Sequence, residues 1–265
     1  MTGAVANLVR GKRVLYLSLE MDQDKIASRF DAQLADVGIN SLLQNQGTVE
    51  RALAEMVRDY EDKRMLFVKQ FPAGSCDVAT IRAYHSQLQM HGFRPDLLIV
   101  DYVGEMKDAP GLPTWESRYR ILRDLRGFGV EQGHCTFTAL QPNRDAVDAQ
   151  QSGYIDESKL GDSFNQNRPL DALWTINQTI KEKSACLGRI FVAKHRNGKS
   201  RYAFKIAFDY YERQTLRMYQ ISDEIYKIRM NEAKEETVEE IDMSKIMGDK
   251  LKKEKDKWEP GKNEA

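Results

Sequence analysis

The chain has 265 residues, which is long enough for the core of one α/β domain and a further terminal segment. Basic and acidic residues number 40 each, so the formal net charge is zero and any contact with nucleic acid has to be local. The three cysteines lack metal-ligand spacing, no apolar stretch approaches membrane-spanning length, and the amino terminus has no signal-peptide pattern. These features favour a reducing, cytoplasmic setting without membrane contact over a disulfide scaffold.

The first part of the chain alternates between short apolar runs, typical of buried strands, and segments whose apolar residues recur at helical spacing. Asp77 stands where it can cap one of these helices. The alternation predicts an α/β fold with a mostly parallel sheet flanked by helices. The predicted strands are 14–19, 66–68 and 97–100, and the predicted helices are 20–37, 49–59, 77–90 and 115–130.

The second part of the chain is richer in predicted strands. Cys135 opens the first of them, and we expect its side chain to lie in the core. The pair Asn197-Gly198 is a strong hairpin-turn signal, which predicts a late antiparallel hairpin. The strands predicted after that first run are 171–177, 190–193, 202–208 and 215–219.

Polar side chains follow four of the predicted strands. Glu20 and Asp101 each end an apolar run, Gln141 ends a third, and Lys194 and Arg196 end a fourth. We expect these groups to lie at one edge of the parallel sheet, where open α/β sheets bind ligands. An acid that polarises water, a metal-binding carboxylate, an amide and two cations are what phosphoryl transfer to water requires.

Each of these residues also has a plain structural interpretation. Asp101 could cap its strand, and Glu20 could be a first-turn acid stabilised by the dipole of the following helix. Lys194 and Arg196, with His195 between them, could be the solvated end of a hairpin. The combination of all four strand ends, rather than any one of them, favours the catalytic interpretation.

Four spaced motifs resemble those of a known family, the C-terminal motor domain of DnaB-type replicative helicases, which is a RecA-like P-loop ATPase. The resemblance extends over about residues 5 to 220. Each motif is short, but their order and distances are fairly specific. The motifs are Ser18-Leu-Glu-Met21, Ile99-Val-Asp-Tyr102, Ala139-Leu-Gln-Pro-Asn-Arg144 and Ala193-Lys-His-Arg-Asn-Gly198.

The resemblance implies a role for each strand-end residue. By match, Glu20 is the catalytic glutamate, and Asp101 is the Walker B aspartate that binds Mg²⁺. Gln141 falls on the glutamine that senses the γ-phosphate of ATP. Lys194 and Arg196 fall on the basic finger that a subunit offers to its neighbour's ATP.

The resemblance also implies an assembly, a substrate, partners and a cellular setting. Its members form rings, usually hexamers, that use ATP and Mg²⁺ to move along single-stranded DNA and unwind duplex during DNA replication. A primase or a helicase loader is an implied partner, and a bacterial or phage-infected cell is the implied setting. In the family, the loop that lines the ring channel corresponds to residues 145–168 here. Its candidate DNA contacts are Lys159, Asp162, Ser163, Asn165 and Arg168.

One family motif is missing, because the pattern Gly-x-x-x-x-Gly-Lys-Ser/Thr occurs nowhere in the sequence. That loop holds the phosphates through backbone N–H groups, a lysine and a hydroxyl. We therefore expect a fragment that begins after the loop and binds ATP poorly alone. We also expect a motor domain over 1–220 and a charged, flexible tail over 221–265.

Two other classes of function are compatible with the same residues. The first is a non-catalytic RecA-like assembly or loader subunit, which would form assemblies without ATP turnover. The second is a recombinase-type or KaiC-like ATPase, which would pair strands without unwinding them. Strand separation by a ring would favour the helicase.

Overall fold

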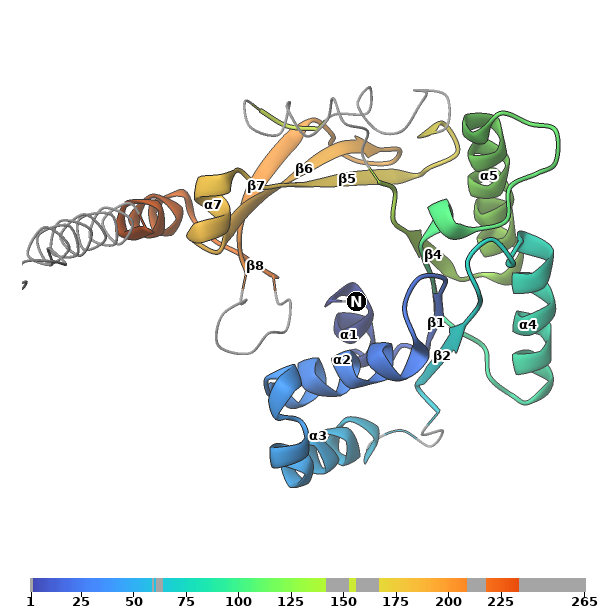
Figure 1. The fold of residues 1–265 in the computed structure, drawn as a ribbon, viewed down its shortest axis with the longest axis horizontal. Helices are drawn as coiled ribbons and strands as arrows, with labels where there is room; N and C mark the ends of the chain where they lie inside the picture. The colour runs from blue at the N-terminus through green and yellow to red at the C-terminus, as the bar shows by residue number, and fades with distance from the viewer. Residues whose placement is uncertain are drawn as a thin grey trace, which may run out of the picture.

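A computed structural model of the chain describes residues 2–58, 60, 64–141, 153–155, 167–208 and 218–233. Within these residues two four-stranded sheets lie next to each other, one parallel and one antiparallel (Figure 1). The parallel sheet is flanked by helices, so the predicted α/β class is confirmed. None of the helices in the described ranges is long and apolar enough to cross a membrane.

The parallel sheet consists of β1 (Val14–Ser18), β2 (Leu66–Gln70), β3 (Leu97–Asp101) and β4 (Cys135–Thr138). Its strand order is β2-β1-β3-β4, and all three neighbouring pairs are parallel. Every residue of β1 is buried, as expected for a strand covered on both faces. The carboxyl ends of all four strands therefore meet at one edge of the sheet.

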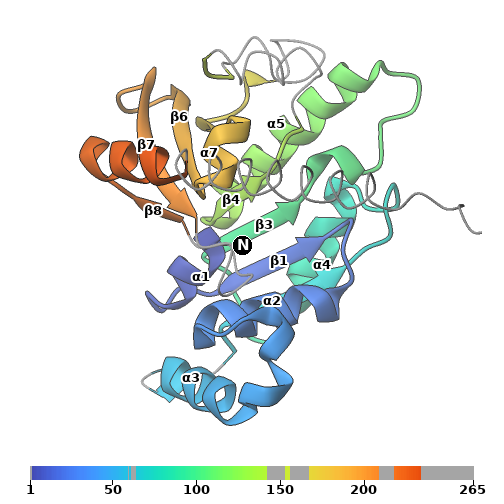
Figure 2. The same ribbon diagram turned by 60° about the vertical axis from the view of Figure 1, so that its left-hand side comes forward.

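Helices cover both faces of this sheet because alternate side chains of each strand point to opposite sides (Figure 2). One face packs against α1 and α2, through side chains such as Tyr16 and Phe30. The other packs against α4 and α5, through side chains such as Val100 and Leu125. The helices are α1 (Thr2–Leu8), α2 (Gln23–Ala35), α3 (Gln46–Arg58), α4 (Val78–Met90) and α5 (Thr114–Gln132), with short 3-10 turns η1 (Ile39–Ser41), η2 (Leu43–Asn45) and η3 (Val103–Glu105).

The antiparallel sheet has the order β5-β6-β7-β8 and is larger than the predicted hairpin. The strand that carries Lys194 belongs to it, so the prediction that this strand ends at the edge of the parallel sheet is wrong. Short connections explain the difference, because they can join antiparallel neighbours, whereas parallel neighbours need a long crossover. The elements are β5 (Ala172–Asn177), α7 (Ile180–Ser184), β6 (Leu187–His195), β7 (Tyr202–Phe208) and β8 (Met218–Gln220).

Cys135 corrects a second expectation, since its side chain is exposed rather than in the core. The reason is that β4 is the terminal strand of the parallel sheet, and its alternate residues Cys135 and Phe137 are exposed. The boundary expected at residue 220 stays a prediction. Beyond it, residues 223–233 are helical, and Tyr226 donates a hydrogen bond to Glu182 of α7.

Candidate functional site

The pairing of β1 with β3 brings two predicted site residues together. Ser18 lies opposite Asp101 in the parallel register, and the N–H of Leu19 donates to the carbonyl of Asp101 at 2.8 Å. Glu20, the next residue, therefore follows β1 directly beside the end of β3. Gln141, which is exposed, follows the end of β4, the strand on the other side of β3. The carboxyl edge of the sheet thus gathers all three residues.

The side chain of Asp101 is positioned by a tyrosine. The hydroxyl of Tyr16, on β1, donates a hydrogen bond to Asp101 Oδ2. Tyr16 is only 2% exposed, and its ring meets Phe30 of α2 edge-on with centroids 5.6 Å apart. Burial and the adjacent Asp101 carboxylate raise the pKa of Tyr16, so the phenol stays protonated and keeps donating. The packing of a helix against the sheet therefore fixes the orientation of this carboxylate.

Sequence reasoning missed Tyr16, although one signal was present. It is the single aromatic residue in a strand of otherwise aliphatic residues and serine, two positions before the strand end. Because side chains alternate along a strand, Tyr16 shares a face with Ser18, and Ser18 lies opposite Asp101. The sequence therefore shows that Tyr16 and Ser18 share a face of their strand. It does not show that this strand pairs with the strand that carries Asp101.

Glu20 lies in the turn between β1 and α2 and is exposed. The helix begins only at Gln23, where the Asp22 side chain caps it by accepting from the N–H of Asp24 at 2.9 Å. The interpretation of Glu20 as a first-turn acid is therefore wrong. The turn is held by the buried hydroxyl of Ser18, which donates to the Met21 carbonyl at 2.5 Å and accepts from the Met21 N–H at 3.1 Å.

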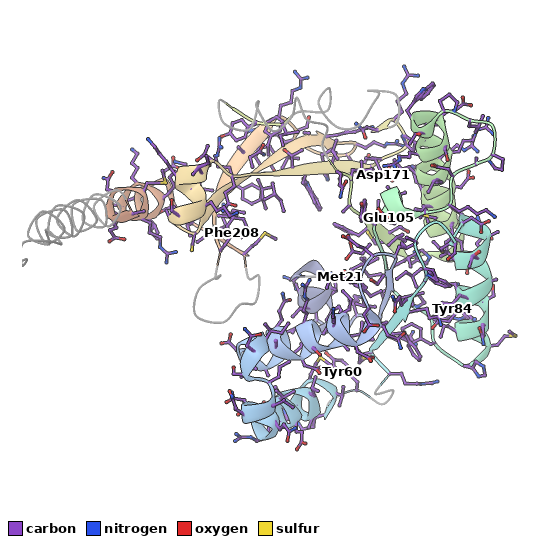
Figure 3. All side chains as sticks on the ribbon, in the orientation of Figure 1. Met21, Tyr60, Tyr84, Glu105, Asp171 and Phe208 are labelled. Atoms are coloured by element: carbon purple, nitrogen blue, oxygen red, sulfur yellow. The ribbon has the colours of Figure 1, made fainter. Side chains whose placement is uncertain are left out.

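A second tyrosine follows Asp101 on the same edge. The Tyr102 hydroxyl donates to Glu105 Oε1 at 2.7 Å, and Glu105 is labelled in Figure 3. This hydrogen bond, with burial and the charges of Glu105 and Glu20, raises the pKa of Tyr102 to about 12. The guanidinium of Arg118 opposes the rise. The edge therefore concentrates carboxylates, which attract cations and repel free anions.

The chemistry of the edge fits a metal ion that arrives with a nucleotide. Mg²⁺ is commonly held by one or two carboxylates, with phosphate oxygens and water completing its shell. Asp101 offers such an oxygen from a fixed side chain. No group of three or more metal-binding side chains occurs within the described ranges. The fixed Asp101 carboxylate has the chemistry of a magnesium ligand.

Of the two predicted finger cations, Lys194 lies in β6 and Arg196 directly follows that strand, and both contact their own chain. Lys194 Nζ donates to the carbonyls of Asn167 and Arg168, at 3.1 Å each. Arg196 Nε lies 3.1 Å from Asp171 Oδ1, and both partners are about half exposed. Both cations therefore point toward the segment that enters β5. Arg168 is exposed, whereas Lys159, Asp162, Ser163 and Asn165 lie outside the described residues.

Comparison with known proteins identifies relatives of this chain. Residues 1–219 match the family model described as DnaB-like helicase C terminal domain. A DnaB-like replicative helicase of Enterobacteria phage T4 is 28% identical over 195 residues. That match covers 71% of this chain and 40% of the relative, so the chain spans less than half of the relative's length.

Solved structures share the fold at low sequence identity. One solved ATPase domain superimposes with a TM-score of 0.68 and 17% identity, covering 83% of this chain and 78% of that one. A DnaB-like replicative helicase, described with its interactions with primase, gives a TM-score of 0.64 and 18% identity, covering 81% and 56%. The fold is thus that of RecA-like helicase ATPase domains.

Proposed function

The chain belongs to the DnaB-like helicase C terminal domain family, and we propose that it acts as the ATP-driven motor of a replicative helicase, moving on single-stranded DNA to unwind duplex. The observation that carries the proposal is the pairing of β1 with β3. The turn that carries Glu20 directly follows the strand end that pairs with Asp101, whose carboxylate Tyr16 holds, and this supports the proposal. Phosphoryl transfer to water needs this combination of groups at one place.

In this proposal each residue of the edge has one task. Asp101, oriented by Tyr16, holds the Mg²⁺ that accompanies ATP. The ion supplies positive charge that neutralises the phosphates. Glu20, exposed on the neighbouring strand end, polarises the attacking water. Gln141 contacts the γ-phosphate from the end of β4.

The cations of β6 act on a neighbouring subunit. Lys194 and Arg196 lie at the end of a hairpin in the second sheet, with Arg196 exposed. We place them against the nucleotide of an adjacent copy, which requires a ring, most simply a hexamer. The segment 145–168 then faces DNA in the channel. Primase or a loader is the proposed protein partner, supported by the structural relative described with primase.

The proposal includes weak nucleotide binding by the chain alone. Its 265 residues contain no Gly-x-x-x-x-Gly-Lys-Ser/Thr loop. Such a loop supplies most contacts to the phosphates. ATP turnover should therefore be measured on this chain joined to a strand and loop of that pattern.

Two aspartates at opposite ends of β3 provide the test. Asp101→Asn removes the charge at the carboxyl edge and should lower ATP turnover by roughly a thousandfold or more. Asp96 precedes the strand and accepts from the N–H of Arg13 at 2.8 Å. Asp96→Asn keeps an acceptor there and should leave turnover nearly unchanged. Equal turnover in the Asp101→Asn protein and the parent would refute the assignment.

A further inference from the structure

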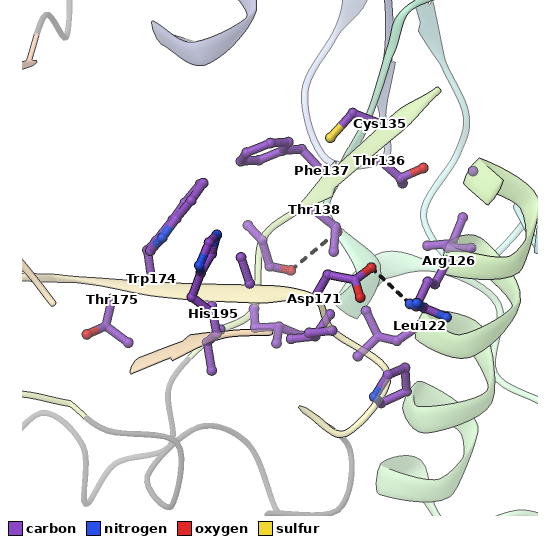
Figure 4. Close-up of a pocket in the computed structure, with 18 of the residues that line it drawn as sticks. Leu122, Arg126, Cys135, Thr136, Phe137, Thr138, Asp171, Trp174, Thr175 and His195 are labelled. Carbon is purple, nitrogen blue, oxygen red and sulfur yellow. Dashed lines mark hydrogen bonds and ion pairs between the residues drawn. The ribbon is translucent and has the colours of Figure 1, made fainter. Parts of the chain in front are cut away.

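The short stretch 153–155 packs on one face of the antiparallel sheet. Ile155 is 4% exposed and belongs with Leu173 of β5 to a small apolar cluster. It also lines a cavity of about 750 Å³ that lies between β4 and β5 (Figure 4). Figure 4 shows Thr175 on the opposite side of β5 from Trp174, and the hydroxyl of Thr175 contacts the stretch. The stretch 153–155 therefore covers the Thr175 side of β5.

The backbone of Ile155 is bound by two side chains of β5. Its N–H donates to Asn177 Oδ1 at 2.8 Å, and its carbonyl accepts from the Thr175 hydroxyl at 2.7 Å. Asn177 Nδ2 in turn donates to the Thr175 hydroxyl oxygen at 2.9 Å. Asn177 is fully buried and Thr175 is 5% exposed, so water competes little for these groups. The two side chains therefore hold Ile155 in one position on the sheet.

Arg189 of β6 holds the other end of the stretch. Its Nη1 donates to the carbonyl of Gly153 at 3.1 Å, and its guanidinium carbon lies 5.0 Å from the centre of the Tyr154 ring. Nη2 of the same side chain donates to Glu182 Oε2 of α7 at 3.0 Å. A guanidinium can make both contacts because its N–H groups spread in a planar fork. Arg189 thus ties the stretch to α7.

The carboxylate of Glu182 connects Arg189 to the C-terminal helix, residues 223–233. The hydroxyl of Tyr226, in that helix, donates a hydrogen bond to Glu182 Oε1, and the helix lies beside α7 (Figure 1). Burial raises the pKa of this carboxyl, but the hydrogen bonds that it accepts, first of all from Tyr226, outweigh burial and lower the pKa below its ordinary value. The carboxylate therefore stays ionised and keeps accepting from both partners.

The C-terminal helix lies beyond residues 1–219, which match the helicase family model. A second contact fixes it to β7, where Lys205 Nζ lies 3.0 Å from Asp223 Oδ1 and 4.4 Å from the centre of the Tyr226 ring. The connected contacts therefore run from an element outside the matched residues to a stretch within 145–168, the segment that the proposed function places against DNA.

We propose that Arg189 and Tyr226 are positioning residues for the binding of single-stranded DNA. Through the carboxylate between them they hold 153–155 in place, so that the C-terminal helix sets the affinity for DNA. A segment that is fixed at more points along its length loses less conformational entropy when it binds. The role in DNA binding rests on the proposed function, whereas the connection between the helix and 153–155 does not.

Hydrogen exchange of the Ile155 amide, followed by NMR on the chain as it is, tests the connection. Arg189→Lys keeps a cation beside Glu182 but replaces the fork with a single ammonium, which cannot hold both acceptors. The Ile155 amide should then exchange about tenfold faster. Tyr226→Phe keeps the ring, removes the hydroxyl and should speed the same amide by about threefold. The amide of Leu15, in β1, should keep its rate in both variants.

Binding of a fluorescein-labelled oligothymidine, measured by fluorescence anisotropy at low salt, tests the role in DNA binding. Arg189→Lys should weaken the affinity by about tenfold and Tyr226→Phe by about threefold, although neither alters the net charge. Arg82→Lys is the matched control, because Arg82 of α4 also combines an acid, Glu131 at 2.6 Å, with an aromatic ring, Phe128 at 4.6 Å. It should change neither the affinity nor the exchange.

Unchanged exchange of the Ile155 amide in either Arg189→Lys or Tyr226→Phe would overturn the proposal. So would an equal acceleration of Leu15, because it would report a general loss of stability. Faster exchange of Ile155 with unchanged affinity for the oligonucleotide would overturn the positioning role as well. A parent chain that binds no oligonucleotide, while Ile155 still responds to both variants, would instead retain the connection to the helix and count against the proposed function.

Discussion

The two sheets hold their charged groups in different ways. At the edge of the parallel sheet, Asp101 accepts a hydrogen bond from Tyr16, a buried side chain that packs against α2. At the end of β6, Lys194 donates hydrogen bonds to backbone carbonyls of its own chain. Arg196 forms an ion pair with the exposed Asp171. Buried contacts hold a group in one geometry, whereas exposed ion pairs contribute little and are easily exchanged. The carboxylate is therefore pre-organised within the subunit, whereas the exposed ion pair of Arg196 is easily exchanged for another acceptor.

The largest expected effect tests whether the cations act between subunits. In assembled rings carrying a phosphate-binding loop, Arg196→Ala should reduce ATP turnover by roughly a thousandfold while leaving nucleotide affinity nearly intact. Lys199→Ala, at an exposed position in the same hairpin, is the control.

Rings that mix two variants test whether Arg196 acts on the ATP of a neighbouring subunit or on the ATP of its own subunit. Subunits with Arg196→Ala and subunits with Glu20→Gln each lack one component, so some interfaces between them combine an intact site with an intact finger. Partial turnover should return on mixing. Rings that mix well and stay inactive would contradict a role across the interface.

A second comparison concerns Arg189 of β6 and Arg196, which directly follows that strand. Arg189 Nη2 donates at 3.0 Å to Glu182, whose side chain is 2% exposed. Arg189→Met leaves that buried carboxylate without its cation and should lower the free energy of unfolding by about 3 kcal/mol. Arg196→Met breaks an exposed pair and should cost less than about 1 kcal/mol. Urea denaturation measures both, and equal losses would show that burial does not separate them.

Acid should destabilise the parallel-sheet region through a pair of histidines. His85 and His134 lie 5.3 Å apart between ring centroids, and burial, with the neighbouring His134, lowers the pKa of His85 to about 4. The unfolded chain, with an ordinary pKa near 6.5, binds the proton more readily. Stability is therefore complete above about pH 6.5 and falls as the pH drops toward about 4.

From about pH 7.5 to about pH 5, the free energy of unfolding should fall by about 2 kcal/mol through His85. His85→Phe should remove this part of the pH dependence. The exposed His195, changed to glutamine, serves as the control. An unchanged pH profile in the His85→Phe protein would assign the acid sensitivity to other groups.

The smallest expected effect concerns the support of Asp101. Tyr16→Phe keeps the ring against Phe30 but removes the hydrogen bond, so water must take its place. We expect about a tenfold loss of ATP turnover in the loop-containing protein, from one lost hydrogen bond to a charged group. The affinity for Mg²⁺ should weaken in parallel. A loss of stability without any change in these two measurements would show that Tyr16 is purely structural.

Much of the local structure was predictable from the sequence. The apolar runs before Glu20 and Asp101 are strands, and Asp77 caps its helix by accepting from the N–H of Thr80. The strand 202–208 has the predicted bounds. These features depend on residues close together in the chain, so periodicity and capping patterns contain the necessary information.

The sequence by itself determined the alternation of strands and helices in the first part of the chain, the bounds of the strand 202–208 and the family resemblance. Tertiary structure alone decided that β6 belongs to a second sheet, that Cys135 lies on an open edge, and that Tyr16 holds Asp101. Each of these depends on which strands are neighbours, a choice made between segments that are separate in the sequence. Local propensity carries no information about such pairings, because the energy that selects them comes from packing the whole sheet against its helices.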